Sequence, residues 1–297
     1  MNSSERSSAP YDLHLHSYWS YDATAEVEGH FKRARELGVR YIAITDHHVM
    51  DASAQVLECA TRYPEVTAIL SSEITVTTSV GGIDLLCYGF PRELTPPLQK
   101  LSDFHHDWQR ATGAAWSRGL QAIGHPFSDD ERMALLETYR PAHVIALQGN
   151  THVKNGVLSD YCVDHGIIVS AGEYAELKAR MRDEVPSPLY PPVEEVLPVL
   201  KTEGIKVAIA HPHRYFNQGD RARMDTLRQE CQLDGIECAH RQVPPEFTPL
   251  YREYCVEHGL FSVGGSDSHT AGDIREHFAG HGGADEWLDK FLGCLAL

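Results

Sequence analysis

The chain has 297 residues, of which 42% are hydrophobic and 23% charged, a composition typical of a soluble globular protein with a large core. Its formal net charge of −16, without any cluster of Lys and Arg, argues against a long nucleic acid as partner. There is no apolar run of about 20 residues and no apolar signal core near the start, so we expect no membrane span and a disordered tail over residues 1–9. Seven scattered cysteines without a CxxC pair indicate a reducing, cytoplasmic compartment.

The stretch YDLHLHS at residues 11–17 predicts a first strand with two histidines on one face. Alternate side chains of a strand point to opposite faces, so the tyrosine and the leucines share one face. The other face carries Asp12, His14 and His16. Two adjacent imidazoles suit one metal ion, whereas the alternative is a half-exposed edge strand with two solvated histidines.

Apolar β-like runs alternate with helical patterns over residues 10–95 and again over residues 201–297. The helix predicted over residues 24–37 has an apolar face and ends at Gly38. Short apolar runs such as VRYIAI, IKVAIA and LFSVGG predict strands. The alternation indicates βα units around a mainly parallel sheet or barrel.

Residues 96–200 have a different pattern, which predicts a helical insertion or cap between the two halves of the β/α body. SPLYPP at residues 187–192 interrupts the helical pattern. The helices predicted in this segment cover residues 98–111, 129–138, 153–165 and 173–183.

Histidine, aspartate or glutamate follows nearly every predicted strand. The carboxyl ends of the strands form the site in β/α barrels and open α/β sheets, so these side chains should converge on one rim. Imidazole together with carboxylate suits Zn, Mn or Fe. In chain order the residues are His14 and His16, then Asp46, His47 and His48, then Glu73, then His211 and His213, and finally Asp267 and His269.

Taken together, DLHLHS, Asp22, TDHH, SSEIT, AHPHRY and GSDSHT resemble the PHP (polymerase and histidinol phosphatase) superfamily. The resemblance covers about residues 10–95 and 190–275. It is greatest to small standalone phosphoesterases that act on nucleoside monophosphates, 3′,5′-bisphosphates or short oligonucleotides. It implies a distorted (β/α)7 barrel with a helical insertion, and two or three divalent metal ions, often Mn, Fe or Zn.

The resemblance also implies the metal ligands. A first metal takes two histidines, a glutamate and an aspartate, the glutamate bridges to a second metal, and a third metal has its own ligands. These sets are His14, His16, Glu73 and Asp267 for the first site, Glu73 and His211 for the second, and Asp22, His47 and His269 for the third.

One position departs from the family pattern. Where these phosphoesterases usually carry a histidine, in a strand after the glutamate, this chain reads GIDLLCYGF and places Asp84 there. An aspartate favours Mn, Mg or Fe over a histidine-rich zinc site, or weakens the second site enough to leave it empty. His125, in AIGHPF, is an alternative ligand, and Asp84 is alternatively a helix cap or a surface acid.

The expected mechanism is attack on phosphorus by a hydroxide that the metals make available. Glu73 would hold the metals at a fixed separation, and Arg214 would bind phosphate oxygens. His213 and His48 are candidates for protonating the leaving group, with solvated loop histidines as the alternative. Further candidates are His152 and Lys154 for contact with the substrate, and Asp12 and Asp46 for orienting the imidazoles.

Three other functions remain open at this stage. One is a phosphatase for another metabolite, such as histidinol phosphate or a sugar cyclic phosphate. Another is a metal-dependent C–N hydrolase, although such barrels often carry a bridging lysine and none follows a predicted strand here. The last is a non-catalytic PHP module. The expected partner is a small phosphorylated substrate, neither long nucleic acid nor membrane, and the oligomeric state stays open.

Overall fold

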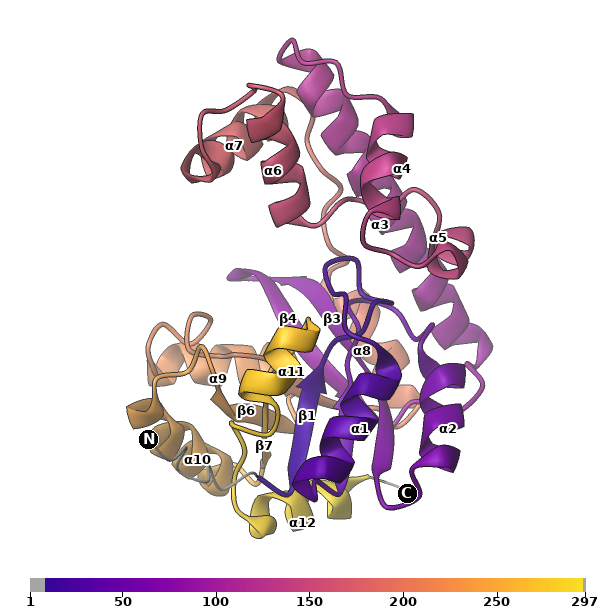
Figure 1. Cartoon of the computed structure of the whole chain (residues 1–297). Helices are drawn as coiled ribbons and strands as arrows, with labels where there is room; N and C mark the ends of the chain where they lie inside the picture. The colour runs from indigo at the N-terminus through magenta and orange to yellow at the C-terminus, as the bar shows by residue number, and fades with distance from the viewer. Residues whose placement is uncertain (1–8, 296–297) are drawn as a thin grey trace, which may run out of the picture. The chain divides into compact units, whose positions relative to one another are not determined.

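The computed structural model describes residues 9–295, which divide into two units (Figure 1). The first unit combines the chain up to residue 101 with the chain from residue 190 onward, and the second covers residues 102–189. We call them the barrel unit and the helical unit. The tail predicted over residues 1–9 lies outside the described residues except for Ala9.

Seven strands form one sheet whose order in space follows their order in the sequence. A bridge between Leu15 and Ser268 links the end of the first strand to the residues that follow the last one, so the sheet is a nearly closed barrel. The prediction of a distorted (β/α)7 barrel is thereby confirmed. The strands are β1 (Tyr11–Leu15), β2 (Tyr41–Ile44), β3 (Thr67–Thr78), β4 (Gly81–Tyr88), β5 (Lys206–Ile209), β6 (Gly235–His240) and β7 (Phe261–Gly265).

Strand β4 is the distorted part of the barrel. It runs antiparallel to β3 and to β5, whereas the other paired strands run parallel. In its register Asp84 pairs with Thr75, near the carboxyl end of β3. The first half of β4 therefore lies at the rim where the parallel strands end, and Asp84 reaches that rim.

Helices surround the strands in the barrel unit (Figure 1). The predicted end of α1 at Gly38 is confirmed, with a left-handed φ of 71° that glycine adopts without strain. None of the helices among residues 9–295 is long and apolar enough to cross a membrane. The helices of this unit are α1 (Val27–Leu37), α2 (Ser53–Arg62), α8 (Val193–Thr202), α9 (Arg221–Glu230), α10 (Thr248–Glu257), α11 (Ala271–His277) and α12 (Asp285–Cys294), with a 3-10 turn η2 (Pro245–Phe247).

Helix α12 packs at the end of the barrel opposite to that rim. The ring of Phe291 lies edge-on to Tyr88 and Phe261, with centroids 5.0 and 5.1 Å away. Tyr88 is the last residue of the antiparallel β4 and Phe261 is the first residue of β7, so both mark this end. Burial of these aromatic rings stabilises the closed end and leaves the other rim for polar side chains.

The helical unit has its own hydrophobic core, which includes Trp116, Leu120 and Phe127. Its first helix covers Pro96–Ala122 and continues 11 residues beyond the end predicted at residue 111. Gly113, inside this helix, allows a close approach, because a Cβ atom there would lie 2.6 Å from the Thr151 carbonyl oxygen. The short α5 was not predicted. The elements are α3 (Pro96–Ala122), which begins in the barrel unit, α4 (Asp129–Glu137), α5 (Ala142–Gln148), α6 (Asn155–Asp164), η1 (Ala171–Glu173) and α7 (Tyr174–Glu184).

Candidate metal centre

Strand β1 and the residue that directly follows it present two fully buried histidines at the rim of the barrel. His14 and His16 have 0% exposed surface, and their Nε2 atoms lie 3.1 Å apart. All residues of β1 are buried on both faces. The alternative of a half-exposed edge strand is therefore wrong, because the closed barrel covers both faces of this strand.

Glu73 is the carboxylate that most of these histidines share. It lies on β3 and is 1% exposed. Burial alone would raise its pKa, but positive charge on His14 and His47 outweighs burial and holds the pKa of Glu73 well below its usual range. Oε2 lies 3.2 Å from His14 Nε2, 3.3 Å from His16 Nε2 and 3.3 Å from His47 Nδ1, while Oε1 lies 3.0 Å from His211 Nε2.

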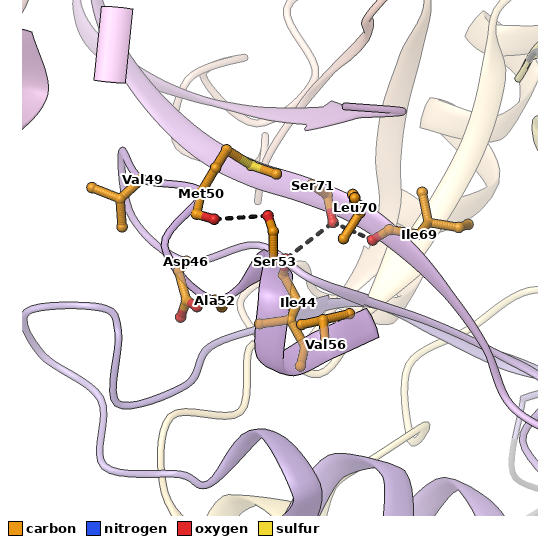
Figure 2. A pocket seen from close by; sticks show the side chains of 10 residues that line it. All are labelled: Ile44, Asp46, Val49, Met50, Ala52, Ser53, Val56, Ile69, Leu70 and Ser71. Atoms are coloured by element: carbon orange, nitrogen blue, oxygen red, sulfur yellow. Dashed lines mark hydrogen bonds between the residues drawn. The ribbon is translucent and has the colours of Figure 1, made fainter. Parts of the chain in front are cut away.

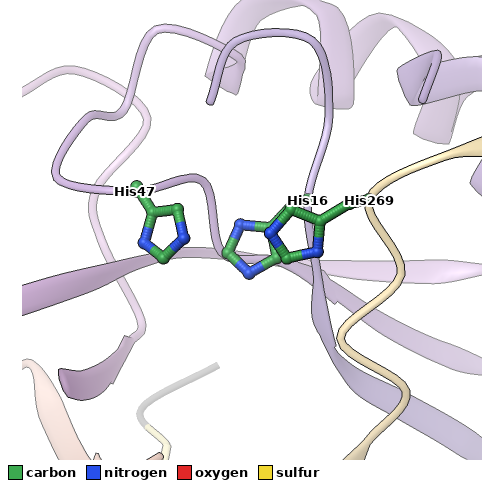
Figure 3. A group of neighbouring side chains, drawn as sticks. All are labelled: His16, His47 and His269. Carbon is green, nitrogen blue, oxygen red and sulfur yellow. The ribbon is translucent and has the colours of Figure 1, made fainter. Parts of the chain in front are cut away.

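The rings of His16, His47 and His269, from three different segments, lie beside one another (Figure 3). The centroid of His16 lies 4.5 Å from that of His47 and 4.1 Å from that of His269. Asp22 Oδ2 lies 3.5 Å from Nε2 of both His47 and His269. Burial lowers the pKa of His47, but the Asp22 and Glu73 carboxylates outweigh it and raise this pKa to about 10. The structure thus brings together the residues predicted for the third site and adds His16.

Asp267 completes the set predicted for the first site. Its Oδ1 lies 3.2 Å from His16 Nε2 and 3.5 Å from His14 Nε2. Although burial raises its pKa, positive charge on His14 and a hydrogen bond from His16 hold the pKa of Asp267 well below its usual range. Two carboxylates and two imidazoles therefore face one another as His14, His16, Glu73 and Asp267.

The residues predicted for the second site also lie together. His211 Nε2 is 3.0 Å from Glu73 Oε1 and 3.8 Å from Asp84 Oδ2. The two oxygens of Asp84 accept the hydroxyls of Thr75, at 2.5 Å, and Tyr215, at 2.6 Å. Each carboxylate oxygen has a second lone pair, so these bonds leave Asp84 able to bind a metal. Imidazole and carboxylate in this arrangement fit divalent metal ions.

Three residues at the rim have backbone conformations that residues other than glycine rarely adopt. His48, His211 and Asp267 have positive φ angles of 69°, 25° and 53°. Such conformations cost on the order of 1–3 kcal/mol each and persist where neighbouring structure holds them. The N–H groups of these residues donate to Glu73 O at 2.8 Å, Glu237 Oε2 at 2.6 Å and His14 O at 2.8 Å, respectively.

The two carboxylates expected to orient imidazoles act on loop backbones. Asp46 accepts the Ser17 N–H at 2.6 Å and the Ser17 hydroxyl at 2.7 Å. Asp12 accepts the N–H groups of Ser266, at 2.9 Å, and Ala279, at 2.8 Å. Both therefore fix segments that flank the candidate ligands.

The last residue of β6, His240, and the next residue, Arg241, are polar residues that the sequence prediction did not include in the site. His240 Nδ1 accepts the Gln242 N–H at 3.0 Å, so Nε2 carries the proton of the neutral ring. This Nε2 lies 3.4 Å from Asp267 Oδ2, so the ring faces that carboxylate. Arg241 lies 3.4 Å from Asp267 and 3.4 Å from Asp273. The sequence does contain a signal for these two residues, because HR directly follows the predicted strand DGIECA, as polar residues follow the other predicted strands.

Glu237, in the middle of β6, was also missed. It is 0% exposed and contacts both His14 and His211. A glutamate inside the apolar run GIECA is the sequence signal that would have revealed it, since a buried carboxylate needs partners.

The residues predicted to handle the substrate are spread more widely. Arg214 is exposed. His213 Nδ1 lies 3.2 Å from the Tyr251 hydroxyl. His48 is buried, and its ring centroid lies 5.7 Å from that of His47. His48 is thus the one of these three placed directly beside a candidate ligand, and the roles of all three stay predictions.

Two further predicted residues belong to the helical unit. His152 is 3% exposed, and its ring lies edge-on to Trp108 and Trp116 at 5.8 and 5.3 Å. His125 lies in the segment between α3 and α4. Among residues 9–295, the four groups of at least three potential metal ligands all lie in the barrel unit and do not include His125.

A small cavity beside the rim is unsuited to a substrate (Figure 2). It lies between β2, β3 and α2, and its lining includes Ile44, Val49, Val56 and Ile69. Its volume of ≈ 10 Å³ is at most that of a single water. The candidate chemistry therefore belongs to the polar clusters and not to this cavity.

The profile of the PHP domain family matches residues 12–184, which is more than half of the chain. The chain belongs to this family. The second half of the barrel lies beyond the matched residues, yet it supplies His211 and Asp267 to the same clusters. No curated protein matches the sequence.

Solved structures with a similar fold include a candidate phosphoesterase and an amidohydrolase. A candidate metal-dependent phosphoesterase from Bifidobacterium adolescentis is 22% identical, with a TM-score of 0.73 over 97% of this chain and 96% of its own. An amidohydrolase from Chromobacterium violaceum, solved with bound sulfate and no metal, is 19% identical, with a TM-score of 0.69 over 95% of this chain and 97% of its own. At these identities the likeness concerns the fold.

Proposed function

We propose that this protein is a metal-dependent phosphoesterase that hydrolyses a phosphate ester of a small molecule. The observation that carries the proposal is the shared position of Glu73, within 3.3 Å of four imidazoles that belong to three clusters. One carboxylate in this position suits two or three adjacent divalent ions. Membership of the PHP family and the fold shared with a candidate phosphoesterase support the same conclusion.

Divalent ions supply an activated water near neutral pH and stabilise charge on phosphoryl oxygens. The ionised Glu73 and Asp267 hold the histidine rings in place and balance the positive charge. His48, buried beside His47, is the better placed of the two predicted proton donors, because His213 bonds to the Tyr251 hydroxyl.

Arg241 lies beside the clusters, 3.4 Å from Asp267. A guanidinium there suits phosphoryl oxygens, so we expect Arg241→Ala to raise KM about 10- to 100-fold at saturating Mn²⁺. Arg214→Ala serves as the matched variant, since Arg214 is exposed and has the same chemistry. Steady-state kinetics of both variants show which arginine binds the phosphate. A larger rise in KM for Arg214→Ala would assign the phosphate contact to Arg214 and not to Arg241.

We further propose a nucleoside monophosphate, a bisphosphate or a short oligonucleotide as substrate. Three tyrosine rings lie beside the clusters, Tyr21 at 5.4 Å from His47, Tyr190 at 5.6 Å from His48 and Tyr215 at 5.7 Å from His211. Aromatic faces of this kind stack on bases without strict sequence preference. The acidic chain favours a small substrate over a long polymer.

The test is phosphate release from a substrate panel with Mn²⁺ present. The panel contains nucleoside monophosphates, 3′,5′-bisphosphates and dinucleotides beside histidinol phosphate, a sugar phosphate and a sugar cyclic phosphate. We expect the nucleotides to have the highest kcat/KM. A preference for the other esters would retain the phosphoesterase and reject the nucleotide. Hydrolysis of amides without phosphate release would favour the C–N hydrolase instead.

A further inference from the structure

Glu237 contacts two candidate ligands without being one itself. Its Oε1 lies 3.0 Å from His14 Nδ1, and its Oε2 accepts the backbone N–H of His211 at 2.6 Å. The side chain is 0% exposed. Both carboxylate oxygens therefore face nitrogen atoms of candidate ligands inside the barrel.

We propose that Glu237 is a positioning residue that sets the ring of His14 and the backbone of His211 together, so that two adjacent metal sites form as a unit. The inference rests on the proposed function, because it takes both histidines as metal ligands. Strand β6 thereby controls the ligands of β1 and of the segment after β5, although none of the predicted ligands lies on β6.

The bond to Glu237 fixes the tautomer of His14. A neutral imidazole has one N–H and one lone pair, and a carboxylate only accepts, so the bond to Glu237 places the proton on Nδ1. The lone pair is then on Nε2. That atom lies 3.2 Å from Glu73 Oε2 and 3.5 Å from Asp267 Oδ1, on the side where the carboxylates gather. Outer partners of this kind orient metal-binding histidines in other proteins.

Glu237 also supports the backbone conformation of His211. Its φ of 25° is unfavourable for a residue with a Cβ and needs support from its surroundings. The Glu237 carboxylate accepts the N–H of this residue. In this conformation His211 Nε2 lies 3.0 Å from Glu73 Oε1. One carboxylate therefore supports a ligand in each of two clusters that share Glu73.

Glu237→Gln is the sharpest variant because it changes one oxygen to an amide nitrogen. Both partners of Glu237 are N–H donors, and a glutamine side chain has a single acceptor oxygen. In either orientation of the amide, one partner faces another donor. We expect Mn²⁺ affinity, measured by competition with a chromophoric chelator, to fall about 10- to 100-fold. Excess Mn²⁺ should restore most of kcat, since Glu237 does not touch the reacting atoms.

Asp234→Asn is the matched control. Asp234 is also a carboxylate with two N–H donors, the backbone of Val207 at 2.8 Å and the Lys201 ammonium at 2.5 Å, and it lies at the start of β5, away from the rim. The same chemical change should lower the melting temperature of the metal-free protein in both variants. Mn²⁺ affinity should change by less than about threefold in Asp234→Asn, because its partners lie at the end of the barrel opposite to the candidate ligands.

The outcomes separate this inference from the proposed function. If Glu237→Gln binds Mn²⁺ as tightly as the wild type, Glu237 is no positioning residue, and the phosphoesterase stands. If both variants lose affinity equally, the effect is general destabilisation and the inference is again overturned. If the wild-type protein itself binds no divalent metal, the inference and the proposed function fail together.

Discussion

Glu73→Gln is expected to lose bound metal and nearly all phosphate release. The amide carries no charge and offers one acceptor to four imidazoles that now lie within 3.3 Å of the carboxylate. Outer-sphere partners of metals are typically worth 10- to 100-fold, so loss of a shared ligand should exceed about 100-fold in activity. Elemental analysis after dialysis and initial rates of phosphate release measure the two effects on one sample.

Asp234→Asn provides the control for this variant. Asp234 accepts the Val207 N–H at 2.8 Å and binds Lys201 at 2.5 Å, at the start of β5 and away from the rim. We expect Asp234→Asn to lower the melting temperature while metal content and activity stay at the wild-type level. Full activity and full metal content in Glu73→Gln would contradict the assignment of Glu73 as the shared ligand.

Metal binding is expected to release protons and to strengthen steeply with pH. In the metal-free protein burial lowers the pKa of His211, but Glu73 outweighs it and raises this pKa to about 9, while the pKa of His47 is raised to about 10. Both rings must lose their protons to bind metal, so the apparent affinity should rise about 10-fold per pH unit for each proton released. Calorimetric titration of Mn²⁺ in buffers of different ionisation enthalpy counts these protons.

The same two histidines predict how stability depends on pH. Their folded-state pKa values lie above the unfolded value of about 6.5, so their stabilisation is fully present below that pH. It is lost as pH rises through about 9 and 10. The melting temperature of metal-free protein should therefore fall from neutral pH upward. The difference in melting temperature between metal-loaded and metal-free protein should increase over the same range. A difference that stays constant between pH 7 and 9 would contradict the pairing of these rings with carboxylates.

The sequence pattern was informative wherever a polar residue follows an apolar strand. His14 lies on β1 and His16 directly follows it, while His211 and Asp267 follow β5 and β7, so the rim rule for β/α barrels predicted that they meet. Glu73 was expected to follow a short strand, but it lies within the longer β3, just beyond the part that pairs with β2. Asp84 reached the rim for a different reason, since β4 runs antiparallel and its beginning lies there. Strand direction depends on pairing across the whole sheet, and local pattern does not encode it.

Other features depend on contacts between distant residues. In the sequence, Glu237 is only a charged residue within a strand, and its role follows from its contacts with His14 and His211. The close approach of Gly113 to Thr151 likewise depends on where a distant segment is placed. Similarly, the left-handed backbone of His48 follows from its bond to the Glu73 carbonyl and not from histidine itself.

The most direct test of the account pairs metal content with phosphate release on one purified sample. We would measure bound Mn, Fe and Zn by elemental analysis, then assay phosphate release from a nucleoside monophosphate before and after chelation and after addition of Mn²⁺. We expect more than one divalent ion per chain, activity that disappears on chelation, and recovery with Mn²⁺. A protein that holds no metal, and gains no activity when Mn²⁺ is added, would contradict it.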